Sequence, residues 1–281
     1  MDEFYGEDGK PDVEYFLECL SVDRFEGEEE DVPGYDEGDF DKFIYGLVEI
    51  DVAKHVAPTP AGMPTLKGSF QPFRNQVQAV AAAIYMKTTP FKGMIIADPP
   101  GWGGKTLSAL MTIAVATKNP KNTNGPCVVV APTIIWFQWM NQIEKFFGQM
   151  PSICINEETN TSPDVDLSKY KIVVTSYAYV VSEVKRRNNF INKMAAYEKD
   201  KTRKLPQKPK LILLPDPSEE EPSKPMGEVL VLDDAHVIHS RSGEIFPAIG
   251  TFRDQFDFCL MMTRIPMEDS WKHAYPLFKM L

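Results

Sequence analysis

The chain has 281 residues, 43% of them apolar, and a net charge of −10. This composition can fill the core of one large domain or two small ones. No apolar run reaches the roughly 18 to 20 residues that a membrane span requires, and the acidic start "MDEFYGEDGK" lacks the basic end and apolar stretch of a secretory signal. These features exclude a membrane protein and favour an intracellular one. The four cysteines lie far apart, without a CxxC pair, and are predicted to be reduced core residues.

The charge is unevenly distributed along the chain. Residues 1–60 hold 19 acidic against 4 basic residues, whereas the remainder holds 21 acidic against 26 basic residues. Within this acidic N-terminal segment, residues 25–41 combine low hydrophobicity with like charge and are predicted to be disordered. Residues 57–69 are rich in Pro and Gly, which is typical of a linker. We therefore predict an acidic arm with its linker over residues 1–69 and a folded domain over 70–281.

From residue 70 onward, short apolar segments alternate with amphipathic ones. Runs of Val, Ile and Leu are typical of strands that are buried on both faces, and the alternation is typical of a parallel sheet covered by helices. We therefore predict an α/β fold. The predicted strands are "GMIIA", "CVVVA", "SICIN", "KIVVTSY", "EVLVLDD" and "FDFCLMMT", and the predicted helices between them are "NQVQAVAAAIYMK", "TLSALMTIAVATK" and "TIIWFQWMNQIEKFF".

One segment, at about residues 184–226, interrupts this alternation. Between residues 185 and 210 there are ten basic residues against two acidic ones, followed by the acidic, Pro-rich "PDPSEEEPSKP". We interpret it as an insertion with a helical basic part and a disordered hinge. The basic part either contacts nucleic-acid phosphates or is a solvated helix face. A third alternative is that the acidic N-terminal segment folds onto it.

The stretch "ADPPGWGGKT" (97–106) has the pattern of a phosphate-binding loop. A strand, a glycine-rich turn and then Lys-Thr at a helix start bring backbone N–H groups and the helix N-terminus to a phosphate. Lys105 is expected to neutralise the phosphates and Thr106 to bind Mg²⁺. The strict pattern fails because Pro99 replaces its first glycine, so a plain turn with an exposed lysine is the alternative. The other loop residues predicted to bind nucleotide are Gly101, Gly103 and Gly104.

A second motif, "VLVLDDAH" (229–236), places two acidic residues at the end of an apolar strand. A P-loop NTPase needs one carboxylate there to hold Mg²⁺ and another to orient the attacking water. We predict that Asp233 holds the metal and that Asp234 is the catalytic acid that activates water, with Lys105 also catalytic. An acid pair at a strand end is common in loops, but both motifs in this order favour an ATP-binding protein.

The order of the motifs resembles the first RecA-like lobe of the Swi/Snf-type DNA-dependent ATPases of helicase superfamily two. The resemblance covers residues 70–281. In "FQPFRNQVQAV" it makes Gln76 the adenine-recognising glutamine, and in "VVVAPTIIWFQWMNQIEKF" it matches Pro132 and the pair Gln138-Trp139. It also implies that Pro132, Thr175 and Ser176 contact DNA. The segments "LDDAH" and "MTRIP" match motifs II and III, with His236 linking the two.

Three departures from the family pattern affect the expected activity. Motif I has an inserted residue and Trp102, and motif III has Arg264 in place of a glycine. Asp234 replaces a glutamate, which withdraws the carboxylate by one methylene. A displacement of about 1 Å can lower a rate on the order of 10²-fold.

The sequence ends at Leu281, soon after motif III, so the second lobe with its arginine finger is expected to be missing. Such a finger is worth about 10³ to 10⁵ in turnover. We therefore expect an ATP- and Mg²⁺-binding lobe with a DNA partner, a nuclear location by resemblance, weak hydrolysis and no translocation. The alternative is a non-enzymatic pseudo-ATPase that binds protein or nucleic acid. A different P-loop enzyme, such as a kinase, is less favoured.

Overall fold

The computed structural model describes residues 62–98, 104–117, 125–157, 165–215, 226–239, 243–264, 266 and 274–281. The acidic N-terminal segment and most of the Pro-rich acidic hinge lie outside the described residues. So do Gly101, Trp102 and Gly103 of the predicted phosphate-binding loop.

The centre of the molecule is a six-stranded sheet whose strands pair in the order β1-β6-β5-β2-β4-β3. Every pair is parallel. Each of the six predicted segments forms a strand, so the predicted α/β fold is confirmed. The strands are β1 (Gly93–Ile96), β2 (Cys127–Ala131), β3 (Ser152–Cys154), β4 (Ile172–Ser176), β5 (Gly227–Asp233) and β6 (Phe256–Met262). Cys127 in β2 and Cys259 in β6 are buried free thiols, as predicted, whereas Cys154 in β3 is a free thiol that is only partly buried. Cys19 lies outside the described residues.

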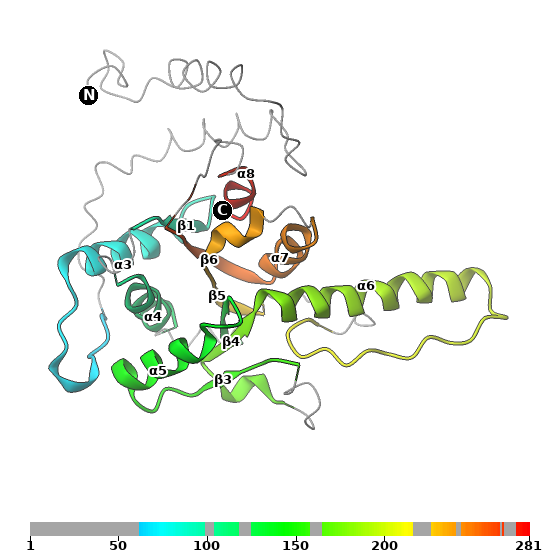
Figure 1. Ribbon diagram of the computed structural model, residues 1–281, viewed down its shortest axis with the longest axis horizontal. Coiled ribbons are helices and arrows are strands. Elements are labelled where there is room, and N and C mark those ends of the chain that lie inside the picture. The colour runs from blue at the N-terminus through cyan, green and yellow to red at the C-terminus, as the bar shows by residue number, and fades with distance from the viewer. Residues whose placement is uncertain are drawn as a thin grey trace, which may run out of the picture.

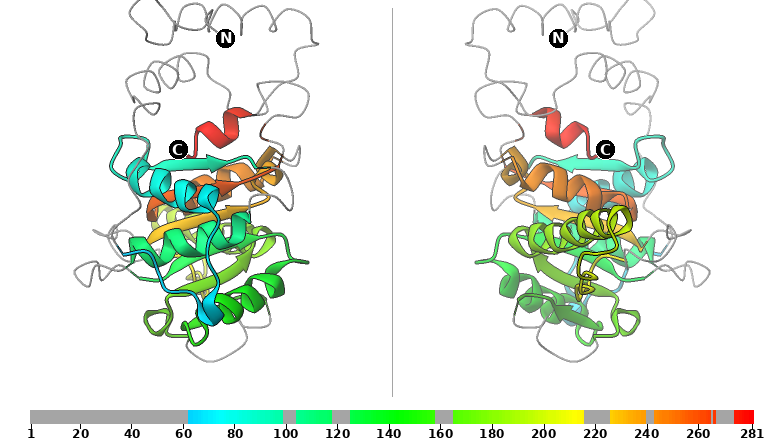
Figure 2. Two further views of the ribbon diagram at one scale, coloured as in Figure 1. Left: turned by 90° about the vertical axis from the view of Figure 1, so that its left-hand side faces the viewer. Right: turned by 90° about the vertical axis from the view of Figure 1, so that its right-hand side faces the viewer.

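Helices cover both faces of the sheet (Figure 1; Figure 2). One face carries α3 (Arg74–Met86), α4 (Lys105–Ala116) and α5 (Trp136–Phe147), close to the three predicted helices. The other face carries α6 (Tyr177–Lys199), α7 (Ile245–Arg253) and α8 (Tyr275–Phe278). Short 3₁₀ helices are η1 (Lys67–Ser69), η3 (Leu167–Lys169) and η4 (Ala235–His239). No helix in the described ranges is long and apolar enough to cross a bilayer.

Alternate residues of each central strand pack into two different cores. In β2, Val128 and Val130 pack with residues of α6 and α7, while Val129 packs with residues of α4 and α5. All three valines are fully buried. Successive side chains of a strand point to opposite faces, so a strand with a helix layer on each side has to be apolar throughout. This is why the continuous apolar runs predicted the strands correctly.

The parallel arrangement brings the carboxyl ends of all strands to one edge of the sheet. The chain leaves β1 toward the predicted phosphate-binding loop, while β5 ends at Asp233 and β4 ends at Ser176. Only β6 lies between β1 and β5. Ligand sites of open parallel sheets lie at this edge, and the two predicted motifs meet there.

Helix α6 extends well beyond the sheet (Figure 1). Its buried residues all lie within its first eight residues, and none of residues 185–210 is buried. After α6 ends at Lys199, the chain returns alongside the helix toward the sheet (Figure 1). We call residues 185–210 the basic arm. The predicted helical basic insertion is thus continuous with a helix that begins at Tyr177.

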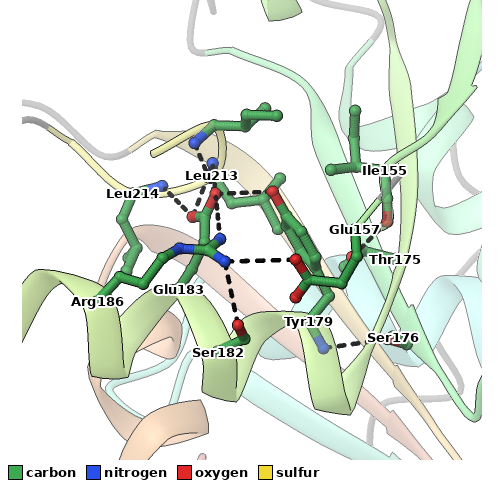
Figure 3. Close-up of polar contacts among 11 residues, drawn as sticks. Ile155, Glu157, Thr175, Ser176, Tyr179, Ser182, Glu183, Arg186, Leu213 and Leu214 are labelled. Atoms are coloured by element: carbon green, nitrogen blue, oxygen red, sulfur yellow. Dashed lines mark hydrogen bonds and ion pairs between the residues drawn. The ribbon is translucent and has the colours of Figure 1, made fainter. Parts of the chain in front are cut away.

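At the base of the basic arm, one buried carboxylate, Glu183, joins α6 to the returning chain (Figure 3). It accepts backbone N–H bonds from Ile212 at 2.6 Å, Leu213 at 3.0 Å and Leu214 at 3.1 Å, and a hydroxyl bond from Tyr179 at 3.1 Å. Burial raises the pKa of Glu183, and the hydrogen bonds from the amides and from Tyr179 oppose that rise. Glu183 therefore attaches the returning chain to α6.

Replacing Glu183 with Gln should loosen this attachment. The amide has one acceptor oxygen instead of two, and its NH₂ group faces backbone N–H donors. We expect a loss of about 1 to 3 kcal/mol in unfolding free energy and faster hydrogen exchange at the amides of residues 212–214. Glu198→Gln, an exposed substitution on the same helix, is the control. Unchanged exchange at those amides in Glu183→Gln would contradict the role given to Glu183.

Candidate functional site

The residue that precedes helix α4 is a glycine in a conformation that favours glycine. Gly104 has φ 54° and ψ 43°, in the left-handed region. A Cβ at this position would also displace the amide end of the Gln76 side chain. Lys105 and Thr106 are then the first two residues of the helix. Backbone N–H groups in the first turn of a helix have no intrahelical partner and attract anions.

Gln76 connects helix α3 to this helix start. Its side chain is buried, with 4% exposed. Its Oε1 accepts the N–H of Phe73 at 2.9 Å, and its Nε2 donates to the carbonyl of Gly104 at 3.5 Å. The residue predicted to recognise adenine therefore lies beside the phosphate-binding loop, and the recognition itself stays a prediction.

The Lys105 side chain turns back toward the end of β1. Its Nζ donates to the carbonyl oxygen of Asp98 at 2.6 Å. Its charge also reaches Asp233, where it is one of the influences that lower the pKa of that carboxyl. The lysine and the aspartate predicted to act on one nucleotide are thus electrostatically coupled.

Asp233 is held on three sides. Its Oδ2 accepts a hydrogen bond from Trp139 Nε1 at 2.8 Å and its Oδ1 accepts one from the backbone N–H of Asp234 at 3.0 Å. The hydroxyl of Tyr177 donates to its main-chain carbonyl at 2.8 Å. Burial raises the pKa of Asp233 and the charge of Asp234 adds to the rise, while the Trp139 hydrogen bond is the largest opposing influence.

Asp234 follows the end of β5 in a conformation that is uncommon for residues other than glycine. Its φ is 49°, in the left-handed region. Among residues other than glycine, Asp and Asn enter this region most readily because their short side chains bond locally. Aspartate is therefore compatible with the backbone conformation of this turn.

His236 and Thr263 connect the two segments that follow β5 and β6. Nδ1 of His236 lies 3.2 Å from the hydroxyl oxygen of Thr263. The threonine is fully buried, and its N–H donates to the carbonyl of Ile96 at 3.0 Å. The expected link between motifs II and III is confirmed as a contact, and it extends to the carboxyl end of β1.

The residues predicted to face DNA differ in accessibility. Pro132 and Ser176 are partly exposed at the carboxyl ends of β2 and β4, and Ser176 Oγ accepts the N–H of Tyr179 as the N-cap of α6 at 3.1 Å. Thr175 differs from the expectation, because it is 1% exposed and its hydroxyl donates to the carbonyl of Ile155 at 2.9 Å. In a strand, neighbouring side chains point to opposite faces, so the sheet buries Thr175 while the strand end leaves Ser176 accessible.

Sequence reasoning noted Trp139 only for its spacing within a motif and missed its contact with Asp233. The tryptophan is 2% exposed within the apolar core beneath α5. Its only polar atom reaches the acid at the strand end. A buried tryptophan usually finds a hydrogen-bond acceptor, which was the available signal.

Residues 70–281 match the family model described as the SNF2-related domain. The chain belongs to that family. A search of curated proteins finds no match to this SNF2-related domain. Two solved structures resemble it with TM-scores of 0.55 and 17% identity: the Sulfolobus solfataricus SWI2/SNF2 ATPase core in complex with dsDNA, and the ATPase core domain of the same organism. The two matches cover 79% and 80% of the 281-residue chain, and they span 37% of each archaeal chain.

Replacing Trp139 with Phe removes the indole donor and retains most of the ring. A hydrogen bond to a charged group contributes about 1.5 to 3 kcal/mol, so unfolding by urea should show a loss of that size at neutral pH. Trp136→Phe on the same helix is the control, because Trp136 packs at the edge of the same core. Equal losses in the two variants would show that ring volume, and not the bond to Asp233, is responsible.

Proposed function

We propose that this SNF2-related domain binds MgATP between the N-terminus of α4 and the end of β5, as the first lobe of a DNA-dependent ATPase. The observation that carries the proposal is the placement of Lys105 in the first turn of α4 and of Asp233 at the end of β5, at the same edge of the sheet. A helix N-terminus, a lysine and a carboxylate are the groups that phosphates and magnesium require.

The residues present fit this ligand. Asp233 accepts one hydrogen bond at each carboxylate oxygen, and a carboxylate has about four acceptor sites, so capacity for the metal remains. Mg²⁺ is commonly held by one or two carboxylates together with substrate phosphates. We assign the metal to Asp233 and the Thr106 hydroxyl, the phosphates to Lys105 and the N–H groups after Gly104, and the adenine to Gln76.

The hydrolytic role falls to Asp234, which follows Asp233 at the end of β5. When bound, magnesium neutralises the charge that develops on the phosphates. Asp234 orients the attacking water. ATPases of the Swi/Snf type also need an arginine from a second lobe, which increases turnover by about 10³ to 10⁵. We therefore propose that this domain on its own binds ATP but hydrolyses it slowly.

DNA is the proposed partner, in contact with Pro132 and Ser176 at the accessible strand ends. The archaeal ATPase core with 17% identity was solved in complex with dsDNA, and this supports the proposal through the shared fold. A role for Thr175 would run through its backbone, because its hydroxyl is occupied. A chromatin partner, a nuclear location and a second lobe are proposed on family membership.

One observation favours the alternative of a pseudo-ATPase. The ammonium group of Lys105 already donates to Asp98, and the Gln76 amide already bonds Phe73 and Gly104. Both side chains would exchange these internal contacts for nucleotide. If the two side chains keep these internal contacts permanently, the chain is a module that binds protein or nucleic acid and does not bind nucleotide.

Thermal unfolding with and without MgATP separates the two functions. A ligand at 100 times its dissociation constant stabilises a protein by about 2.7 kcal/mol. For a domain of this size, that corresponds to a rise of about 5 to 10 °C in Tm. We expect this rise in the natural chain and in Lys171→Ala, an exposed control, and its loss in Lys105→Ala. If MgATP does not change the Tm of the natural chain, the result would support the pseudo-ATPase instead.

A further inference from the structure

The basic arm has an excess of positive charge that the proposed nucleotide site does not use. Residues 185–210 hold ten Lys and Arg against two acidic residues, in a chain whose net charge is −10. None of these residues is buried, and α6 carries the arm away from the sheet (Figure 1). The arm is therefore a concentrated positive surface on an acidic protein.

A surface hollow of about 810 Å³ lies between α6 and the returning chain. Lys193 of the helix lines one side, and Arg203 and Lys204 of the returning chain line the other. The remaining lining residues are Ala196, Leu205, Pro206 and Gln207. The hollow thus brings cations from both halves of the arm to one place, and no carboxylate lines it.

Several cations of the arm are not neutralised by the described residues. Lys185 pairs with Glu244 at 2.6 Å, and Arg203 pairs with Asp200 at 3.3 Å. In the described part of the chain no carboxylate lies within ion-pair distance of four exposed lysines: Lys193, Lys199, Lys201 and Lys204. Exposed cations without a neighbouring carboxylate raise the local positive potential, which attracts an anionic partner.

The length of the arm and the burial of its aromatic residues favour duplex DNA over single-stranded nucleic acid as the anionic partner. The helical part from Lys185 to Lys199 is about 22 Å long at 1.5 Å per residue. Phosphates of one DNA strand recur about every 3.4 Å along the duplex axis, so the arm matches a run of about six. Single-stranded nucleic acid is bound by exposed aromatic rings that stack on bases, and the two aromatic residues of the arm, Phe190 and Tyr197, are both partly buried.

We propose that the basic arm is a second DNA contact, which binds the phosphate backbone of a duplex without reading its sequence. The Glu183 attachment holds the two halves of the arm together before binding, which lowers the entropy lost on association. This contact is separate from the strand-end contact at Pro132 and Ser176 and requires no nucleotide.

The test uses the full chain, a 20-base-pair duplex and fluorescence anisotropy at several salt concentrations without nucleotide. The arm variant replaces Lys193, Lys199, Lys201 and Lys204 with Ala. The control variant replaces four exposed lysines elsewhere, namely Lys67, Lys145, Lys169 and Lys171. Each phosphate contact contributes about 0.9 to the slope of log affinity against log salt. We expect the arm variant to lose at least about 10-fold in affinity and about 2 to 4 units of slope, and the control to lose far less.

Three results would overturn the proposal. The first is an unchanged DNA affinity in the arm variant, and the second is an equal loss of DNA affinity in the control variant. The third is an arm variant that no longer binds a polyglutamate peptide but keeps its DNA affinity. The last result would assign the arm to an acidic protein segment. The MgATP-induced rise in Tm should be the same in the arm variant and the natural chain, so failure here and failure of the nucleotide proposal are distinguishable.

Chemical footprinting tests the same contact in the natural chain, without substitution. Saturating duplex DNA should slow acetylation of the four arm lysines relative to the four control lysines. A duplex of shuffled sequence should protect them equally. Equal acetylation rates with and without DNA at the arm lysines would overturn the proposal independently of any variant.

Discussion

A strand that is covered by helices on both faces cannot carry a polar site along its length. In this domain the central strands are apolar because each face packs into a different core. Polar chemistry is therefore confined to the strand ends, and parallel pairing places all carboxyl ends at one edge. The start of α4 and the acidic end of β5 meet there for this reason, although their residues are more than 120 positions apart in sequence.

Buried donors then determine how the acidic strand end is presented. Trp139 comes from the core under α5 and Tyr177 from the start of α6, and both bond Asp233. Asp234, the residue after the strand, has a left-handed backbone conformation. His236 and Thr263 extend the same set of contacts to β6. Helix layers on both faces of the sheet thus support one edge.

The sequence predicted the fold well and the site in part. Six apolar runs predicted six strands, because a strand that is buried on both faces appears in the sequence as a continuous run of apolar residues. The glycine at position 104 is explained by its left-handed conformation. The burial of Thr175 and the Trp139 bond to Asp233 could not be predicted, because both depend on which distant backbone or carboxylate packs beside them. The basic charge of the arm was visible in sequence, but the Glu183 attachment that holds its two halves together was not.

The central claim is that the first turn of α4 and the end of β5 form one site for MgATP. NMR with paramagnetic Mn²⁺ in place of Mg²⁺ tests it most directly, because Mn²⁺·ATP broadens signals of nuclei near the metal. We expect the backbone amides of Lys105, Thr106 and Asp233 and the indole N–H of Trp139 to broaden together at low Mn²⁺·ATP. Sharp signals at these residues, with broadening instead at the lysines of the basic arm, would show that the nucleotide binds only as a polyanion and would contradict the account.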